Sequence, residues 1–175
     1  AGLTGIVQHL LRLADMYLGY AETLSACDQR NEAIKYVNKI RARAGIPGYG
    51  AVGTKDDNGF ACIPYEDTRD GVDKRIHRER LVELMFEMGI IFFDVRRWKV
   101  ADMAVGDDWI YPKYHRGGEG GPIHGMAFRS DAPAFFEKVV VETRTFLPKH
   151  YLFPIPDEDV RRNPKMVQNL GWTTE

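Results

Sequence analysis

The chain has 175 residues, of which 44% are hydrophobic and 28% are charged, a composition typical of one globular domain with a sizeable core. Its 24 Lys and Arg residues nearly balance 25 Asp and Glu residues, so charge gives no reason to expect binding to nucleic acid or to an acidic membrane surface. No apolar segment approaches the roughly 20 residues that span a bilayer. The two cysteines, Cys27 and Cys62, are too few for a disulfide framework and lack metal-ligand spacing.

The first predicted helix lies near the start of the chain. Apolar residues at Leu10, Ala14, Tyr17, Ala21 and Leu24 recur every three or four positions, as on one face of an amphipathic helix. The opening has no basic segment of the kind that begins a signal peptide. We expect the chain to begin in the lead-in to a helix, as a piece of a longer protein would.

A second helix is predicted over 33–44, where the apolar pattern repeats until Gly45 and Pro47 stop it. Asp28 or Asn31, in the polar break before it, could cap its N-terminus. Because the link between the two helices is so short, they are expected to lie antiparallel.

This hairpin has the length of one tetratricopeptide-like unit. Small residues at Ala14, Ala21 and Ala33 allow the helices to approach closely. Three tyrosines are expected to fill the space between the helices: Tyr17, Tyr20 and Tyr36. A lone unit cannot bury both of its faces, so further units are expected to stack against it.

Residues 46–71 are dense in Gly, Pro, Asp and Asn and predict an ordered loop. A long third helix is predicted to follow. Asp70 or Asp73 can cap it, and apolar residues run along one side as far as Trp98 or beyond.

The rest of the chain predicts little regular structure. Residues 106–136 are so rich in Gly and Pro that helix and long strand are both disfavoured, and a surface excursion is expected. A short strand is predicted over 138–146, followed by an extended Pro-containing segment and a short helix from Asp157 to Asn163. The predicted fold class is therefore mainly α: a tetratricopeptide-like hairpin and a long helix, with extensive ordered loops and little β-structure.

A row of glutamates, Glu79, Glu83 and Glu87, lies four residues apart in the third predicted helix. Paired carboxylates catalyse glycoside hydrolysis, but they flank a substrate and usually come from different elements. Arg78 and Arg80 are interleaved with this row, so surface ion pairs or buried Arg–Glu contacts are the favoured interpretation. The five histidines are scattered and form no metal-binding pattern, so neither a metal nor a cofactor is expected.

Aromatic residues in the two loops are the candidate ligand-binding residues. They lie among Gly, Asp and Lys, where a ring can stack on the apolar face of a sugar while polar neighbours bind its hydroxyl groups. The candidates are Trp109, Tyr111, Tyr114, Tyr49 and Tyr65, and Phe60 lies in the same loop as the last two. The alternative is that these rings fold inward and anchor long loops to the body of the protein.

The segment FFDVRRWKVADM, residues 92–103, concentrates aromatic and charged residues. On a helix, Phe92 and Val95 share a face, and Arg97 lies within reach of Asp94. The pattern predicts a structural interlock, aromatic on one side and ion-paired on the other, rather than a binding site.

Four segments resemble, in order and spacing, the C-terminal part of the SusD/RagB family of nutrient-binding lipoproteins. They are LADMYLGYAE, EAIKYVNKIRARAG, RERLVELMFEMGIIFFDVRRW and YLFPIPDEDVRRNPKMVQNLGW. The resemblance implies that residues 1–175 are the C-terminal portion of such a domain, without its N-terminal half, signal peptide and lipidated Cys.

The resemblance also implies a function. Members of this family are not enzymes: they capture oligosaccharides, or in some cases peptides, and deliver them to a TonB-dependent (SusC-like) transporter. They are surface-exposed lipoproteins of the outer membrane, held there only by an N-terminal lipid anchor that this chain lacks. A helical protein-interaction scaffold without its own ligand remains the competing interpretation.

Overall fold

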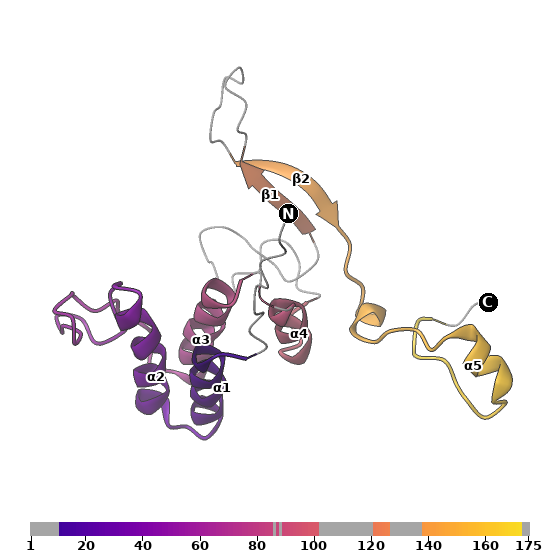
Figure 1. The fold of residues 1–175 in the computed structure, drawn as a ribbon, viewed down its shortest axis with the longest axis horizontal. Helices are drawn as coiled ribbons and strands as arrows, with labels where there is room; N and C mark the ends of the chain where they lie inside the picture. Colours follow the sequence, from indigo (N-terminus) through magenta and orange to yellow (C-terminus); the bar gives the residue numbers. More distant parts are fainter. Residues whose placement is uncertain (1–10, 86, 88, 102–120, 127–137, 173–175) are drawn as a thin grey trace, which may run out of the picture. The chain divides into compact units, whose positions relative to one another are not determined.

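The computed structural model describes residues 11–85, 87, 89–101, 121–126 and 138–172 (Figure 1). The chain forms two compact units, Ala1–Ile91 and Phe92–Glu175. The first contains α1 (Leu13–Ala26), α2 (Arg30–Arg43) and α3 (Arg69–Glu83), and α4 (Ile90–Arg97) begins at its end. The second contains β1 (Gly121–Met126), β2 (Lys138–Arg144), a 3-10 helix (Pro148–Tyr151) and α5 (Asp157–Arg162). The predicted fold class, mainly α with little β, is confirmed.

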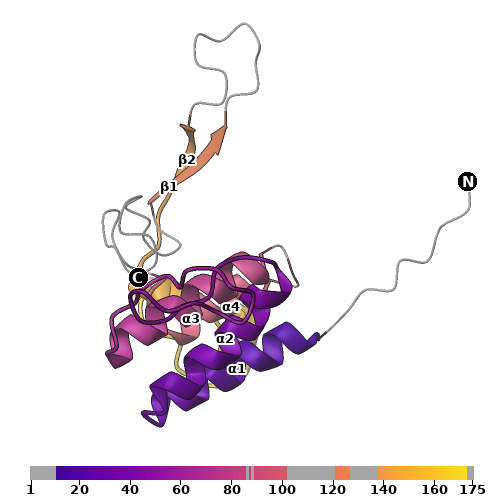
Figure 2. The ribbon, with the colours of Figure 1, turned by 90° about the vertical axis from the view of Figure 1, so that its left-hand side faces the viewer.

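Helices α1 and α2 form the predicted antiparallel hairpin (Figure 2). The predicted caps of α2, Asp28 and Asn31, are wrong, since Gln29 occupies the N-cap position without a side-chain bond. Asp28 instead makes the turn, with a φ of 60°. This left-handed conformation is one that Asp tolerates better than most residues.

The alanines, Tyr17 and Tyr36 have the predicted places in this hairpin, whereas Tyr20 is exposed and does not fill the space between the helices. Ala21 and Ala33 are fully buried, so the two backbones approach closely. The Tyr36 ring makes edge-to-face contacts with Tyr17 and Tyr20, with centroids 5.6 and 4.8 Å apart. Edge-to-face pairs of this kind add stability beyond the apolar area they bury.

The outer side of α1 remains uncovered. Leu13, Met16 and Tyr20 are all exposed. They recur at three- and four-residue spacing and so share one helix face. Our prediction that a further helical unit covers this face stays a prediction.

Helix α3 packs on the hairpin through Val72 and Ile76, which are fully buried. Its N-cap is Thr68, whose hydroxyl accepts from the Gly71 N–H at 3.0 Å, so the predicted caps Asp70 and Asp73 are wrong. Thr at this position satisfies an amide that the helix leaves without a partner.

The prediction of one long third helix that reaches Trp98 is also wrong. Helix α3 ends at Glu83, and a separate helix α4 starts at Ile90. Gly89, between them, has a φ of 69°. That left-handed conformation cannot continue an α-helix and is readily adopted by Gly. The apolar periodicity runs across the break, which is why the pattern alone predicted one helix.

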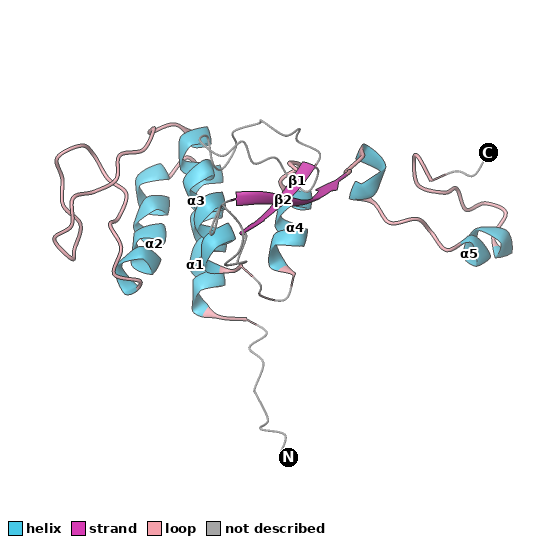
Figure 3. Cartoon of the chain, turned by 90° about the horizontal axis from the view of Figure 1, so that it is seen from above, coloured by secondary structure: helices cyan, strands magenta, loops and turns pink. Residues whose placement is uncertain are grey.

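In the second unit, β1 and β2 pair as an antiparallel two-stranded sheet (Figure 3). The predicted strand is confirmed as β2. Strand β1 was not predicted, because it lies in the Gly- and Pro-rich segment where local propensity disfavours strand. Pairing with β2 overrides that propensity, with an irregularity in register between Ile123 and His124.

The C-terminal segment is ordered by side chains that bind its backbone. Gln168 donates to the Ile155 carbonyl at 2.7 Å and accepts from the Ile155 N–H at 2.8 Å. The Trp172 indole N–H donates to the carbonyls of Lys149 and Leu152, both at 3.0 Å. The short helix predicted from Asp157 is confirmed as α5. None of the helices in the described part of the chain is long and apolar enough to cross a bilayer.

Candidate functional site

The loop that carries Tyr49, Phe60 and Tyr65 is bound firmly to α2. The Asn38 side chain donates to the Tyr49 carbonyl and accepts from the Tyr49 N–H, each at 2.8 Å. Arg41 Nε donates to the Pro47 carbonyl at 2.7 Å. These bonds fix the start of the loop on the last turns of the helix.

Asp56 organises the interior of the same loop. Its carboxylate accepts from the backbone N–H groups of Gly48 at 2.7 Å, Asn58 at 3.0 Å and Phe60 at 2.9 Å. These bonds lower the pKa of Asp56 below its ordinary value, because they stabilise the charged carboxylate. Gly59, with a φ of 81°, makes the tight turn between these partners. The loop is therefore ordered, as predicted, and its backbone folds around one carboxylate.

The two tyrosines predicted as ligand-binding residues in this loop differ from each other in burial. Tyr49 is only 3% exposed, and its ring lies under the guanidinium of Arg41, 4.4 Å from the centroid. Burial raises the pKa of the Tyr49 hydroxyl. At Tyr49 the structure thus favours the alternative interpretation, an inward-facing anchor.

Tyr65 packs edge-on against Tyr49, with centroids 6.5 Å apart, but it stays partly exposed. Partial burial raises the pKa of its hydroxyl as well. Its ring combines support from the core with access to solvent. Contact with a ligand at Tyr65 remains a prediction that this geometry permits.

The other three predicted site residues, Trp109, Tyr111 and Tyr114, lie outside the described residues. Their role in ligand binding stays a prediction. The two candidates that the structure describes, Tyr49 and Tyr65, lie together at the foot of the first loop.

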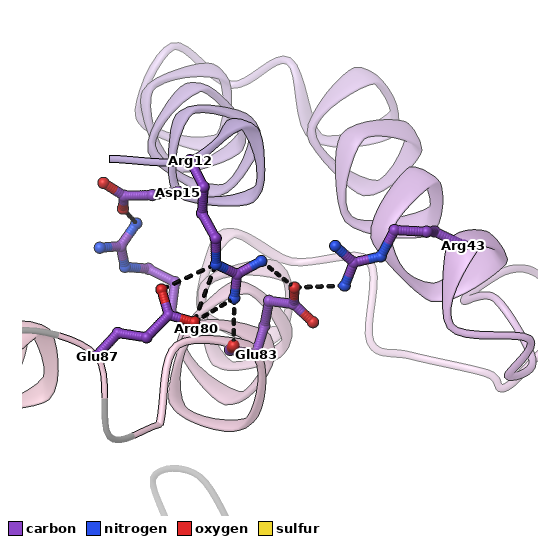
Figure 4. Close-up of polar contacts among 6 residues, drawn as sticks. All are labelled: Arg12, Asp15, Arg43, Arg80, Glu83 and Glu87. Carbon is purple, nitrogen blue, oxygen red and sulfur yellow. Dashed lines mark hydrogen bonds and ion pairs between the residues drawn. The ribbon is translucent and has the colours of Figure 1, made fainter. Parts of the chain in front are cut away.

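The glutamate row forms ion pairs, as predicted, but with arginines of other helices (Figure 4). Glu83 accepts from Arg12 Nη1 at 2.5 Å and also pairs with Arg43 of α2. Glu87 accepts from Arg12 Nη2 at 2.6 Å. Arg12 therefore joins the start of α1 to the end of α3 and to the turn that follows it. No sequence signal links these residues, because they are more than 70 positions apart.

Glu79 lies deeper than the other two glutamates. It is 4% exposed, and its Oε2 atom lies 2.7 Å from Arg41 Nη1. Burial raises the pKa of the Glu79 carboxyl despite the neighbouring arginine. A carboxylate sealed in this way cannot flank a sugar chain, so the row does not have the geometry of a glycosidase site.

The interlock predicted around Trp98 is confirmed in its polar part. Asp94 is buried and accepts from Arg97 Nε at 2.9 Å. The Arg96 guanidinium lies 3.3 Å from the Phe92 ring centroid, and that of Arg97 lies 5.0 Å from the Trp98 ring. Trp98 itself is partly exposed.

Metal chemistry finds no support in the part of the chain that the structure describes. No group of three or more His, Cys, Asp or Glu side chains lies close enough there to hold an ion. Cys27 and Cys62 are free thiols, the first exposed and the second partly buried. The arrangement in the described part of the chain is that of a helical support with ordered loops.

The SusD family model matches residues 4–172, so the chain belongs to the SusD family. A SusD-like protein from Bacteroides fragilis, BF3747, shares 30% identity with it at a TM-score of 0.65, over 93% of this chain and 25% of that one. BT4246 in its selenomethionine form shares 29% identity at a TM-score of 0.67, over 98% of this chain and 26% of that one. A second structure of BT4246 shares 28% identity at a TM-score of 0.66, over 97% of this chain and 25% of that one.

This chain therefore spans about a quarter of the length of the solved structures it matches. No curated protein matches it. The resemblance inferred from four sequence segments is thus confirmed, while the activity, ligand and partners of the whole protein remain to be proposed.

Proposed function

We propose that this chain is part of a surface protein that binds oligosaccharides and delivers them to a TonB-dependent transporter of the outer membrane. The observation that carries the proposal is the family match over residues 4–172, since SusD-like proteins are in general glycan-binding components of nutrient uptake. The membrane association we propose is peripheral, through an N-terminal lipid anchor on the longer protein.

The loop on α2 supports a binding role. A loop of this length with so little regular structure is usually functional. Here Asn38 and Asp56 hold its backbone in place before any ligand arrives. Preorganisation of this kind lowers the entropy lost on binding, which favours affinity. We propose that the aromatic residues Trp109, Tyr111 and Tyr114 of the second loop also bind the ligand.

The carboxylates support binding over hydrolysis. Glu79 and Glu83, the residues that a glycosidase would need, both pair with arginines: Glu79 with Arg41 of α2, and Glu83 with Arg43 of α2 and with Arg12, just before α1. We therefore propose that the protein is not an enzyme. Incubation with the glycans it binds should release no shorter products, and product release would contradict this part of the proposal.

Calorimetric titration of the full-length protein with a panel of oligosaccharides tests the function. We expect heat of binding with at least one glycan, and co-purification of the transporter when the two are expressed together. Binding to peptides instead of glycans would point to a peptide-binding member of the family. Co-purification without heat from any glycan or peptide would point to a scaffold without a ligand of its own.

A further inference from the structure

Six arginines of the first unit form ion pairs with carboxylates. Ion pairs to Asp or Glu are made by Arg12, Arg30, Arg41, Arg43, Arg69 and Arg80. Arg75, in the middle of α3, forms no hydrogen bond or ion pair with any residue that the structure describes. Among the described residues it is a cation without a counter-charge, whereas six other arginines of the unit have one.

Arg75 is also partly withdrawn from water. Its guanidinium lies over the Tyr49 ring, 5.5 Å from the centroid, and its Nε atom is buried without an acceptor. A buried donor that lacks a partner costs free energy, and more so when it belongs to a charged group. Such a group calls for an explanation, and an absent anionic partner is the simplest one.

Glu79, four residues further along α3, already has an arginine partner. Glu79 pairs with Arg41 Nη1 at 2.7 Å, and the same nitrogen donates to the Tyr49 hydroxyl at 3.4 Å. The guanidinium groups of Arg41 and Arg75 therefore both lie over the Tyr49 ring, and one carboxylate, that of Glu79, pairs with Arg41. This patch has an excess of positive charge, which favours a bound oxyanion.

Tyr65 adds an aromatic ring to the same patch. It packs edge-on against Tyr49 at an interplanar angle of 74° and remains partly exposed. Tyr49 is thus a buried support that Arg75 and Tyr65 both contact. An aromatic ring and an unpaired guanidinium on one support match the two sides of an acidic sugar, its apolar face and its carboxylate.

We propose that Arg75 and Tyr65 form a subsite for an acidic sugar, in which the guanidinium pairs with the carboxylate of a hexuronate and the tyrosine packs on the pyranose ring. The proposal rests on the proposed function, because it specifies the chemical class of one residue of the glycan. It places Tyr65 at the ligand and leaves Tyr49 beneath it as support.

The test uses the full-length protein and an array of hexuronate-containing oligosaccharides, each paired with its carboxyl-reduced neutral form. Binding is measured for the wild type, Arg75→Gln, Arg75→Lys and Tyr65→Ala. Arg69→Gln is the matched control, since Arg69 is an exposed arginine on the same helix with a 3.8 Å contact to Asp73. The unfolding midpoint of every variant is measured alongside.

We expect the wild type to bind at least one acidic glycan about tenfold or more tightly than its neutral form. Arg75→Gln should abolish this preference without weakening binding of the neutral form, whereas Arg69→Gln should preserve it. Arg75→Lys should keep part of it, because Lys retains the charge and loses the planar fork. Tyr65→Ala should weaken binding of both forms.

Two results would overturn the subsite while leaving the proposed function intact. They are equal binding of acidic and neutral forms by the wild type, and an undiminished preference in Arg75→Gln. Failure of the wild type to bind any glycan in this array would also overturn the subsite, and the calorimetric panel of oligosaccharides then decides the proposed function separately.

Discussion

Arg41 of α2 and Glu79 of α3 form a buried ion pair in which Nη1 and Oε2 are 2.7 Å apart. Arg41 also donates from Nε to the Pro47 carbonyl and covers the Tyr49 ring. One side chain thus joins two helices to the start of the loop we propose as a ligand support. The pair is structural, and it sets the position of the residues that contact ligand in our account.

Removing Arg41 should destabilise the protein strongly. Arg41→Ala leaves the Glu79 carboxylate buried and unpaired, and the loss of one partner from such a pair costs about 3 to 5 kcal/mol. Burial already raises the pKa of Glu79, so the folded state holds its proton more tightly than the unfolded chain does. Its contribution to stability therefore falls as pH rises from the ordinary value of 4.5 through the raised pKa.

The Arg41→Leu, Glu79→Leu double variant is the control for that prediction. It removes both charges together, so no unpaired charge is left, and it should be clearly more stable than Arg41→Ala. Chemical denaturation measures the free energy of unfolding of the wild type, Arg41→Ala and the double variant. A loss below about 1 kcal/mol for Arg41→Ala would show that the pair is solvated and contributes little.

The Asp56 carboxylate should make the first loop sensitive to acid. Its folded-state pKa lies below the ordinary 3.8, so the folded state binds this proton less tightly than the unfolded chain does. Its stabilising effect is therefore complete above pH 3.8 and is lost as pH falls through the lowered pKa. We expect the amide signals of Gly48 and Phe60 in NMR spectra to shift together over that acidic range.

Asp56→Asn is the matching variant for this titration. It should remove the acid transition and accelerate hydrogen exchange of the Gly48 and Phe60 amides at neutral pH. An amide side chain has one oxygen, so it cannot accept from both sides of the loop as the carboxylate does. Unchanged exchange at both amides would mean that other bonds hold the loop.

Arg12 should hold the turn between α3 and α4. Its guanidinium is partly exposed and binds Glu83, Glu87 and the Glu83 carbonyl (Figure 4). We expect Arg12→Ala to cost about 1 to 2 kcal/mol, since several charge-assisted bonds are lost from a half-solvated site. The Glu87 and Ile90 amides should exchange faster.

Arg43→Ala is the control for Arg12, because Arg43 pairs with the same Glu83 from a more exposed position. It should cost less than about 0.5 kcal/mol. If both variants lost the same free energy of unfolding, the additional bonds made by Arg12 would add nothing to stability.

The parts of the fold that follow from local pattern were predictable from the sequence. The α1–α2 hairpin with its Tyr17 and Tyr36, β2 and α5 all depend on residues close together in the chain. The break after Glu83 was not predictable, since apolar periodicity continues across it and only the φ of Gly89 reveals the turn. Strand β1 depends on a partner strand, and its own residues disfavour it.

The candidate site was predictable as a region and not in detail. Gly- and aromatic-rich composition marked the first loop, but the burial of Tyr49 depends on Arg41 and Arg75 from two helices. The roles of Asn38 and Asp56 were not predicted, because these side chains bind backbone groups that only the fold brings near. The unpaired state of Arg75 is likewise a property of the fold.

Trp98 should contribute a moderate amount to stability. Its ring is partly exposed and lies near the Arg97 guanidinium, 5.0 Å away. Fully buried aromatic residues cost about 3 to 5 kcal/mol when cut to Ala, so we expect about 2 kcal/mol for Trp98→Ala. Chemical denaturation checks this value. A loss above about 4 kcal/mol would indicate complete burial in the full-length protein.

Native affinity electrophoresis of the full-length protein tests glycan binding and the loop aromatics together. The wild type should be retarded in gels that contain a recognised polysaccharide, and the Trp109→Ala, Tyr111→Ala, Tyr114→Ala triple variant should migrate freely with an unchanged unfolding midpoint. Equal retardation of the two proteins would remove these residues from the site. Free migration of the wild type in every polysaccharide gel would contradict the proposal that this protein binds glycans.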